Sequence, residues 1–379
     1  MGPSLITTNG AWQPRSTCPP RFSWPRFFKS LQAYPRSTRR RGPIQDPDHI
    51  LELTRHLADG VLFPTANEVD VADLVPRSLL DRLADIGLYG LTAPVERGGL
   101  GLDGAPAWRV IETLAGGCLA TTFVWLQHLS VASTLARLDT PLAKELIEPM
   151  CDGTVRAGIA LGGARPMPSL SAVRAGGGWI LNGESPWVTG WGLIDLVHVA
   201  ARADDQVVWG LIDATGSTSL RVDALHLVAV NASGTVTLTF EDHFVPNERC
   251  TFTIDYPQWQ AIDAANLRTN GSLALGVIGR CLTLLGSSSS HNVAEWEEDL
   301  DNLRRALDTA SPAEMPEVRA RAAEFALRAA AAVLVSEGSR SLLEGKNGQR
   351  LLREAGFLLV FGSRPAINAS LMNRLTGPK

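Results

Sequence analysis

Apolar and polar residues alternate along Thr235-Val236-Thr237-Leu238-Thr239-Phe240, and this stretch sets the fold class of the chain. Alternation is the pattern of a half-buried strand, because successive side chains of a strand point to opposite faces of a sheet. Strand-like sequence extends outward from it over about 155–253. Inside that segment, Gly176–Gly178 and Asn182-Gly183 bracket the short apolar run Trp179–Leu181, which is typical hairpin punctuation. The middle of the chain is therefore predicted to be a β domain.

Helical patterns flank this β segment on both sides. Over about 48–150, apolar residues recur at helical spacing, beginning with Ile50, Leu53 and Leu57. Beyond the β segment, helices are expected at about 260–285, 291–309, 313–339, 349–361 and 364–375. This order excludes a doubly wound sheet, in which strands and helices alternate throughout. The sequence predicts a mainly α protein with a central β domain.

Charge is divided unevenly between the first 45 residues and the rest of the chain. The 379 residues carry a formal net charge of -4, yet residues 1–45 hold eight basic residues and no acidic one. Residues 46–379 therefore hold 27 basic residues against 39 acidic ones, a net charge of -12. Binding along a nucleic acid needs a cationic surface, so we expect no nucleic-acid partner.

Residues 1–47 are expected to form a basic disordered or targeting tail. A transit peptide there would direct the protein to the mitochondrial matrix; without one, the cytoplasm is expected. The five cysteines include no CxxC pair and the seven histidines form no metal motif, so we expect a reducing compartment and no metal. The uncharged run Thr113–Ala136 includes several polar residues, and we expect a buried core helix rather than a membrane span.

Three stretches, in order along the chain, resemble signatures of the acyl-CoA dehydrogenases. The first runs from Leu83 to Leu102 and includes Ile86-Gly87-Leu88-Tyr89-Gly90 and Gly98-Gly99-Leu100-Gly101. The second is Leu181-Asn182-Gly183 followed by Trp187-Val188-Thr189, and the third is Phe240-Glu241-Asp242 followed by Val245-Pro246. Each stretch lies in the matching block of the chain, and the resemblance covers roughly residues 48–375.

The resemblance implies three domains and a flavin. It implies an N-terminal helical domain at 48–153, a small β-barrel-like domain at 154–256 and a C-terminal four-helix bundle at 257–379. It further implies FAD between the β domain and the bundle, an acyl thioester as substrate, α,β-dehydrogenation as the reaction, and a homodimer or homotetramer. No membrane partner is implied.

The same resemblance assigns residues to the flavin. Trp187 matches a position near the flavin ring, and Thr189, next to Val188, matches one that hydrogen-bonds the polar edge of the ring. The family's Thr-Glu-Pro stretch falls at Gly162–Ala164, so around Leu161, Gly162 and Gly163 only backbone donors remain. An arginine-rich segment that reaches the FAD phosphates is replaced by Ser287–Asn292. FMN, or reduced flavin supplied by a partner enzyme, would need less of that phosphate site.

The catalytic glutamate of the family has no counterpart. The stretch Arg350–Gly362 resembles, without a gap, the family segment that carries this glutamate, and the glutamate position falls on Gly362. Glycine has no group that accepts the α-proton, and a positioned base is worth two to four orders of magnitude in rate. Two residues are candidates to replace this base, Asp263 and His128. The alternative interpretation of Asp263 is a capping acid near a helix start, and that of His128 is a buried core histidine.

Three functions follow as hypotheses. The first is a flavin-dependent oxidoreductase that resembles the acyl-CoA dehydrogenases but lacks the usual base. The second is a flavin-dependent monooxygenase on the same fold, which His128 would serve near a flavin–oxygen adduct. The third is a non-catalytic subunit or scaffold that retains the fold. Gly362 is expected just before the final helix, either facing the flavin or as a helix cap at positive φ.

Overall fold

The computed structural model describes residues 46–287 and 293–377. They belong to one compact unit that spans residues 41–379. The expectation of a basic tail over residues 1–45 lies outside the described part of the chain. No helix of the described residues is both long and apolar enough to cross a lipid bilayer.

Six α-helices open the described chain, as the periodicity predicts. They are α1 (Pro47–Leu57), α2 (Phe63–Asp70), α3 (Arg77–Asp85), α4 (Gly104–Gly117), α5 (Leu119–Ala136) and α6 (Pro141–Cys151). Their starts follow local chemistry: the side chain of Asp46 accepts a hydrogen bond from the Asp48 amide, and Thr140 caps α6 in the same way. A proline occupies the first turn after each of these caps, where its missing N–H costs nothing.

The single core helix expected over Thr113–Ala136 is wrong in one respect. The run is buried, but it forms two helices, because Cys118 adopts an extended conformation between α4 and α5. Gly116 and Gly117 precede the break, and glycine is a poor helix former. The first glycine is needed for packing: a Cβ on Gly116 would lie 2.9 Å from the carbonyl oxygen of Gly276.

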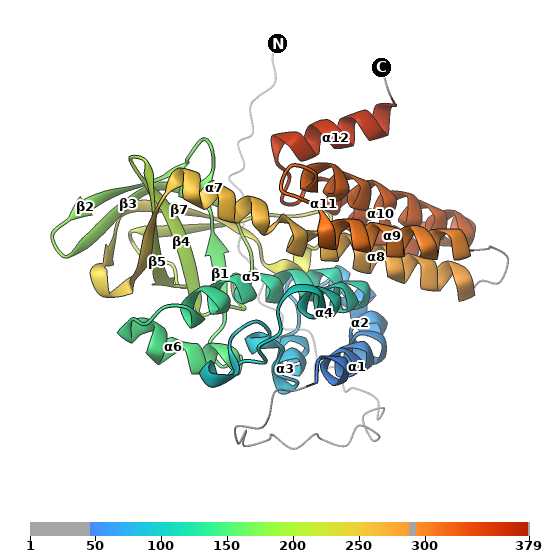
Figure 1. Cartoon of the computed structure of the whole chain (residues 1–379), viewed down its shortest axis with the longest axis horizontal. Coiled ribbons are helices and arrows are strands. Elements are labelled where there is room, and N and C mark those ends of the chain that lie inside the picture. Colours follow the sequence, from blue (N-terminus) through green and yellow to red (C-terminus); the bar gives the residue numbers. More distant parts are fainter. Residues whose placement is uncertain (1–45, 288–292, 378–379) are drawn as a thin grey trace, which may run out of the picture. The chain divides into compact units, whose positions relative to one another are not determined.

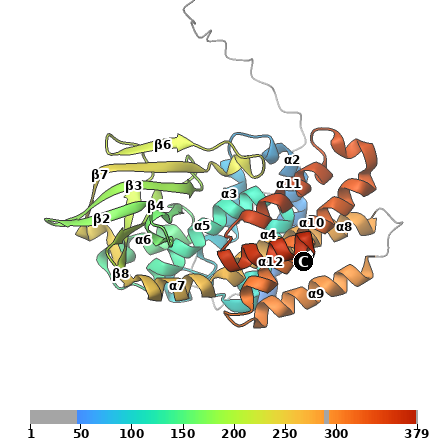
Figure 2. The same cartoon turned by 90° about the horizontal axis from the view of Figure 1, so that it is seen from above.

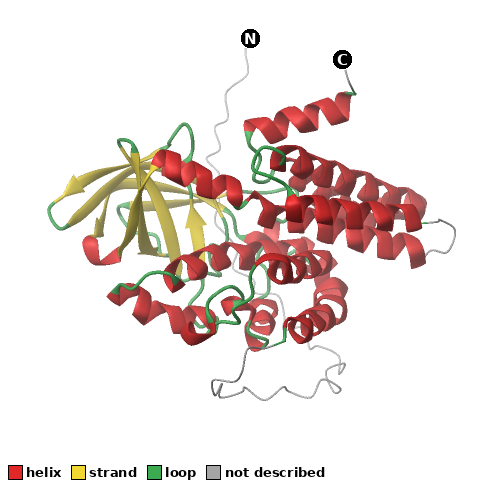
Figure 3. Ribbon diagram, viewed as in Figure 1, coloured by secondary structure: helices red, strands yellow, loops and turns green. Residues whose placement is uncertain are grey.

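The strands form one mixed sheet, shown in yellow in Figure 3. They are β1 (Ala157–Ala160), β2 (Leu170–Ala175), β3 (Gly178–Val188), β4 (Leu196–Ala203), β5 (Gln206–Asp213), β6 (Leu220–Ala224), β7 (Val236–Pro246) and β8 (Cys250–Asp255). Their order is β6-β7-β3-β2-β4-β5-β8, with β1 parallel to β4, and β6, β7 and β3 lie side by side in Figure 2. The central β domain is confirmed; in the described residues it is an open sheet with β6 and β8 at its edges, not a closed barrel.

One of the two predicted hairpin brackets is confirmed and the other is wrong. A turn at Gly176-Gly177 joins β2 to β3, with Gly177 at φ +81°. Asn182-Gly183, however, lies inside β3 and does not end it. The Asn182 side chain donates to Asp242 at 2.9 Å, and the ladder between β3 and β7 shifts register beside Gly183. Leu181 pairs with His243 and Gly183 with Phe240, so the extra residue of this bulge lies in β7, where Asp242 has φ +49°, and β3 continues through Gly183 at φ +117°.

Six helices complete the chain. They are α7 (Tyr256–Ala265), α8 (Leu267–Ser287), α9 (Ala294–Thr309), α10 (Met315–Glu337), α11 (Asn347–Val360) and α12 (Pro365–Thr376). The helix expected at about 260–285 is divided at Asn266, so that α7 leads from the sheet to the start of α8 (Figure 1). The other four lie where they are predicted. Buried residues of α4 and α5 share one core with those of α8 and α10, which places the sheet beside a continuous helical body.

Candidate functional site

Trp187 stands out of the sheet on a bulge at the end of β3. Ser185 pairs with Leu238 and Val188 pairs with Val236, so β3 has one residue more than β7 in this interval. Pro186 cannot donate to the ladder, which favours a bulge at this point. Trp187 adopts φ +66°, and 57% of its surface is exposed. A bulky residue in the left-handed region is strained, and such residues concentrate at functional sites.

Thr189 is buried two residues further along and begins a chain of hydroxyl groups. Its Oγ1 lies 3.1 Å from Oγ1 of Thr235, which lies 2.8 Å from Oγ of Ser233. Three hydroxyls carry three protons, and the two bonds use only two of them. One donor of this buried chain therefore remains for another acceptor. The Gly190 amide donates to the carbonyl of Ser233 at 2.9 Å and fixes the segment in place.

The structure brings the loop Leu161–Gly163 next to this strand end. The Gly162 amide donates to Oγ of Ser185 at 3.0 Å, so this donor is already used within the chain. Gly163 lies against β4, where a Cβ would be 2.3 Å from the backbone nitrogen of Arg202. Leu161 packs with the apolar cluster around Trp209. Packing alone therefore requires both glycines to be small.

Gly362 lies between α11 and α12, just before the final helix, as predicted. Its φ is +60°, which agrees with the interpretation as a helix cap. A Cβ at this position would lie 3.0 Å from Nδ2 of Asn270 on α8. A side chain amide thus faces the place from which a catalytic carboxylate would extend.

Asp263 is engaged in an ion pair. Arg364 donates from Nη2 to Oδ1 at 2.6 Å and from Nε to Oδ2 at 2.8 Å. Both carboxylate oxygens are occupied by this bidentate pair, which joins the end of α7 to the start of α12. The geometry gives Asp263 a structural partner rather than the open oxygen that a base needs.

His128 is a fully satisfied core histidine. Its Nε2–H donates to the carbonyl of Met150 at 3.0 Å, and its Nδ1 accepts from the Ala157 amide at 3.1 Å. Burial lowers the pKa of His128 to about 3, so the ring is neutral at physiological pH. Both nitrogens serve the backbone of neighbouring elements, and neither is available to a flavin.

Comparison with known proteins decides the family. Residues 45–154 match the model of the acyl-CoA dehydrogenase N-terminal domain. Over these residues the chain belongs to the acyl-CoA dehydrogenase family. Its fold agrees over nearly the whole chain: a glutaryl-CoA dehydrogenase from Mycobacterium smegmatis, solved in complex with FADH2, superposes with a TM-score of 0.73 at 18% identity, covering 88% of this chain and 95% of that one.

Two curated relatives carry names of different acyl-CoA chemistry. Benzylmalonyl-CoA dehydrogenase of Aromatoleum aromaticum is 28% identical over 205 residues, 50% of this chain and 53% of that protein. The 3-sulfinopropanoyl-CoA desulfinase of Cupriavidus necator is 30% identical over 164 residues, 41% of this chain and 42% of that protein. The chain thus spans about half the length of the curated relatives that it matches.

A flavin ring, the cofactor of the acyl-CoA dehydrogenase family, fits the residues at the end of β3. The exposed Trp187 indole offers a stacking surface, and the hydroxyl chain from Thr189 to Ser233 retains a donor for a polar ring edge. The expectation for the phosphate segment Ser287–Asn292 lies outside the described residues apart from Ser287 itself.

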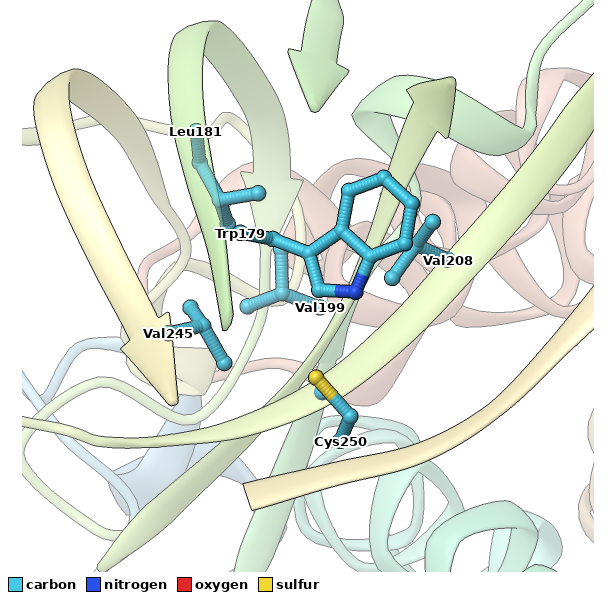
Figure 4. Close-up of a pocket in the computed structure, with 7 residues that line it drawn as sticks. Trp179, Leu181, Val199, Val208, Val245 and Cys250 are labelled. Carbon is cyan, nitrogen blue, oxygen red and sulfur yellow. The ribbon is translucent and has the colours of Figure 1, made fainter. Parts of the chain in front are cut away.

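The hollow shown in Figure 4 belongs to the core of the β domain and not to this site. It holds about 10 Å³, close to the space for one water molecule. The lining is mostly apolar, and the sulfur of Cys250 points into the hollow: Trp179, Leu181, Val199, Val208, Gly210, Val245 and Cys250. It is too small for any cofactor or substrate.

Sequence reasoning missed the residues that support the predicted site. Ser185 ties the loop at Gly162 to β3, and Asn270 faces Gly362 from a helix 92 positions earlier in the chain. Neither residue belongs to a motif or a periodic pattern. Only the fold brings them to their partners, so no sequence signal was available for either.

Proposed function

We propose that this protein is a flavoprotein that binds FAD beside the end of β3 and acts on an acyl-CoA thioester. The observation that carries the proposal is the bulge that holds Trp187 exposed at φ +66°. The strained residue Trp187 lies next to the buried hydroxyl of Thr189, whose hydrogen-bonded chain has one unused donor. Both features suit a wide planar ring with a polar edge.

The chain's own residues divide the work at the ring. The Trp187 indole packs on the flavin, and the Thr189 hydroxyl chain donates to a polar atom at its edge. Val188 is fully buried between them and anchors the bulge to the core. When bound, the flavin supplies reversible hydride or electron acceptance. FMN or reduced flavin from a partner enzyme is the alternative cofactor.

We further propose that the reaction does not use a carboxylate at position 362. Gly362 faces the Asn270 amide, and the carboxylate of Asp263 is held by Arg364. A desulfinase among the relatives acts on an acyl-CoA, so the lack of a dehydrogenase base is compatible with acyl-CoA chemistry of another kind. His128 does not support the monooxygenase alternative, because both of its ring nitrogens are hydrogen-bonded within the chain.

Flavin binding tests the proposal directly. The full-length protein is titrated with FAD and with FMN, and bound flavin is measured by its visible spectrum and fluorescence. Trp187→Ala is expected to weaken flavin binding at least about fivefold, because base-like stacking on an aromatic is worth roughly 1–3 kcal/mol. Phe244→Ala is the control, since Phe244 is another exposed aromatic of the same sheet. If the wild-type protein bound neither flavin, the proposal would fail and the hypothesis of a non-catalytic scaffold would replace it.

A second experiment concerns the missing base. Gly362→Glu alone is strained at φ +60° and collides with Asn270, so the glutamate is introduced together with Asn270→Ala. Anaerobic addition of acyl-CoAs of several lengths is followed by flavin bleaching. Faster bleaching in the folded double variant than in Asn270→Ala alone would indicate a dehydrogenase that lacks only its base. No gain at any chain length would abandon that interpretation.

We propose a homodimer or homotetramer as the working state. Apolar side chains are exposed on helices of the C-terminal segment, among them Val360, Met372 and Leu375. Covering such residues in a second copy would remove apolar surface from water. Light scattering on the eluate of a sizing column gives the mass, and a monomer at all concentrations would contradict the assembly.

A further inference from the structure

Arg319 on α10 is a buried cation without a partner. Only 2% of its surface is exposed. Its Nε and Nη1 atoms make no hydrogen bond, and no ion pair within residues 46–287 and 293–377 includes it. Buried charges are normally paired and hydrogen-bonded, because an unsatisfied one is costly. This guanidinium therefore calls for an anion that the described part of the chain does not supply.

The carboxylates around Arg319 are already committed to other arginines. Asp308 accepts hydrogen bonds from Arg268 and from Arg109, and Asp263 is held by Arg364. Burial, together with the positive charges of Arg268 and Arg364, lowers the pKa of Arg319 to about 10. The group is thus still charged at neutral pH, and this corner of the bundle carries an excess of positive charge.

The unpartnered arginine packs against Gly271, the residue that follows Asn270 on α8. A Cβ on Gly271 of α8 would lie 3.5 Å from Cδ of Arg319, so this glycine leaves the arginine room to cross the helix. The preceding residue, Asn270, faces Gly362. Arg364 follows Gly362 by two residues. Where the family register puts a carboxylate, this chain therefore has the Asn270 amide, and the nearby Arg364 is already paired with Asp263.

We infer that Arg319 and Asn270 form a binding site for an acidic group carried on the acyl part of the thioester, of the carboxylate or sulfinate class. The inference rests on the proposed function, since it uses the expectation that the acyl chain reaches Gly362. A guanidinium matches the two oxygens of such a group, and the Asn270 amide can donate to one of them. The buried setting suits a small oxyanion better than a nucleotide phosphate.

Paired thioesters that differ only in the acidic group test the inference. Calorimetric titrations of the full-length flavin-loaded protein compare glutaryl-CoA with pentanoyl-CoA and succinyl-CoA with butyryl-CoA, and CoA alone reports on its phosphates. We expect the acidic member of at least one pair to bind about tenfold more tightly to the wild type, and Arg319→Met to abolish the preference. Arg321→Met, on the same helix, is expected to keep it.

Stability separates this role from a structural one. Without ligand, Arg319→Met is expected to melt at or above the wild-type temperature, because the unpaired charge is gone. Arg319→Lys keeps the positive charge but loses the bidentate geometry of the guanidinium, and it is expected to reduce the preference for the acidic thioester without abolishing it. If Arg319→Met fails to fold, Arg319→Lys replaces it in the test.

Each remaining outcome overturns a defined statement. If wild type binds neutral thioesters but shows no preference for an acidic partner, the inference fails and the proposed function stands. If Arg319→Met weakens CoA alone as much as it weakens the acidic thioesters, the anion is a phosphate and the inference fails. If the wild type binds no thioester, the proposed function fails and the inference with it.

Discussion

Two arginines of the C-terminal helices are equally buried and differently surrounded. Arg350 on α11 and Arg319 on α10 each expose 2% of their surface. Arg350 donates from Nη1 to Glu354 at 2.9 Å, from Nε to Asn67 at 3.0 Å and from Nη2 to Asn347 at 3.2 Å. Burial acts to lower its pKa, but the charge and hydrogen bond of Glu354, together with the charges of Cys118 and Asp70, outweigh burial and the pKa is raised. Arg319 has no such partner, and its pKa is lowered.

The difference in partners distinguishes an arginine that stabilises the fold, Arg350, from one that we infer to bind a ligand, Arg319. Arg350 joins α11 to α2 through Asn67, so its hydrogen bonds hold the last helices to the first. Arg319 makes no ion pair within the described residues, and its charge is a cost to the folded chain. A cost of this kind persists where a ligand makes use of it.

The largest effect is expected from breaking the satisfied arginine. Arg350→Met leaves Glu354 buried without its cation, and we expect a loss of about 3–5 kcal/mol in the free energy of unfolding. Urea denaturation measures it. The double variant Arg350→Met, Glu354→Leu is the control and should recover much of the loss. A single variant within about 1 kcal/mol of the wild type would remove the contrast between the two arginines.

Measuring the unfolding free energy as a function of pH extends the comparison to buried histidines that are neutral in the native protein. Burial lowers the pKa of His128 and of His198 to about 3, whereas the unfolded chain protonates them near 6.5. Below pH 6.5 the unfolded state takes up protons that the native state refuses, so stability falls as pH falls. The loss approaches about 1.4 kcal/mol per pH unit for each histidine until pH nears 3.

The unfolding free energy at pH 7.5, 6 and 5 checks this dependence. His128→Gln should reduce the slope below pH 6.5 by about the share of one histidine. His49→Gln, at an exposed position, should leave the slope unchanged. An unaltered slope in His128→Gln would mean that this ring is protonated in the native protein.

A smaller effect of opposite sign is expected at the unsatisfied arginine. Arg319→Met removes a buried group without hydrogen bonds and should raise the free energy of unfolding by about 1–2 kcal/mol. Arg321→Met is expected to lie within about 0.5 kcal/mol of the wild type. If Arg319→Met were as destabilising as Arg350→Met, both arginines would stabilise the fold, and the contrast between them would be wrong.

The smallest effect concerns the glycine beside this cluster. Gly362→Ala should cost about 1 kcal/mol, because alanine at φ +60° is strained. Gly356→Ala on α11 is the matched control; its Cβ meets nothing within 4 Å, and it should stabilise the helix by about 1 kcal/mol. Equal effects of both changes in urea denaturation would contradict the interpretation of Gly362 as a cap.

The sequence predicts the order of helices and strands because that order depends on local periodicity. It also predicts the place of Gly362, since the segment around it resembles the family without a gap. It does not predict the break at Cys118 or the β7 bulge opposite Asn182, because residues far along the chain set both: the Gly276 backbone for the first and Asp242 for the second. The sequence does not predict the unpaired state of Arg319 for the same reason, because that state depends on which residues lie near it in the folded protein.

The contact between α4 and α8 has a consequence for synthesis on the ribosome. Gly116 meets Gly276, so the first helices complete their core only with helices made after the whole sheet. At about 5–20 residues per second, the intervening chain takes roughly ten to thirty seconds to emerge. During that interval the apolar faces of α4 and α5 have no native cover, and a nascent chain in this state is a candidate client for chaperones.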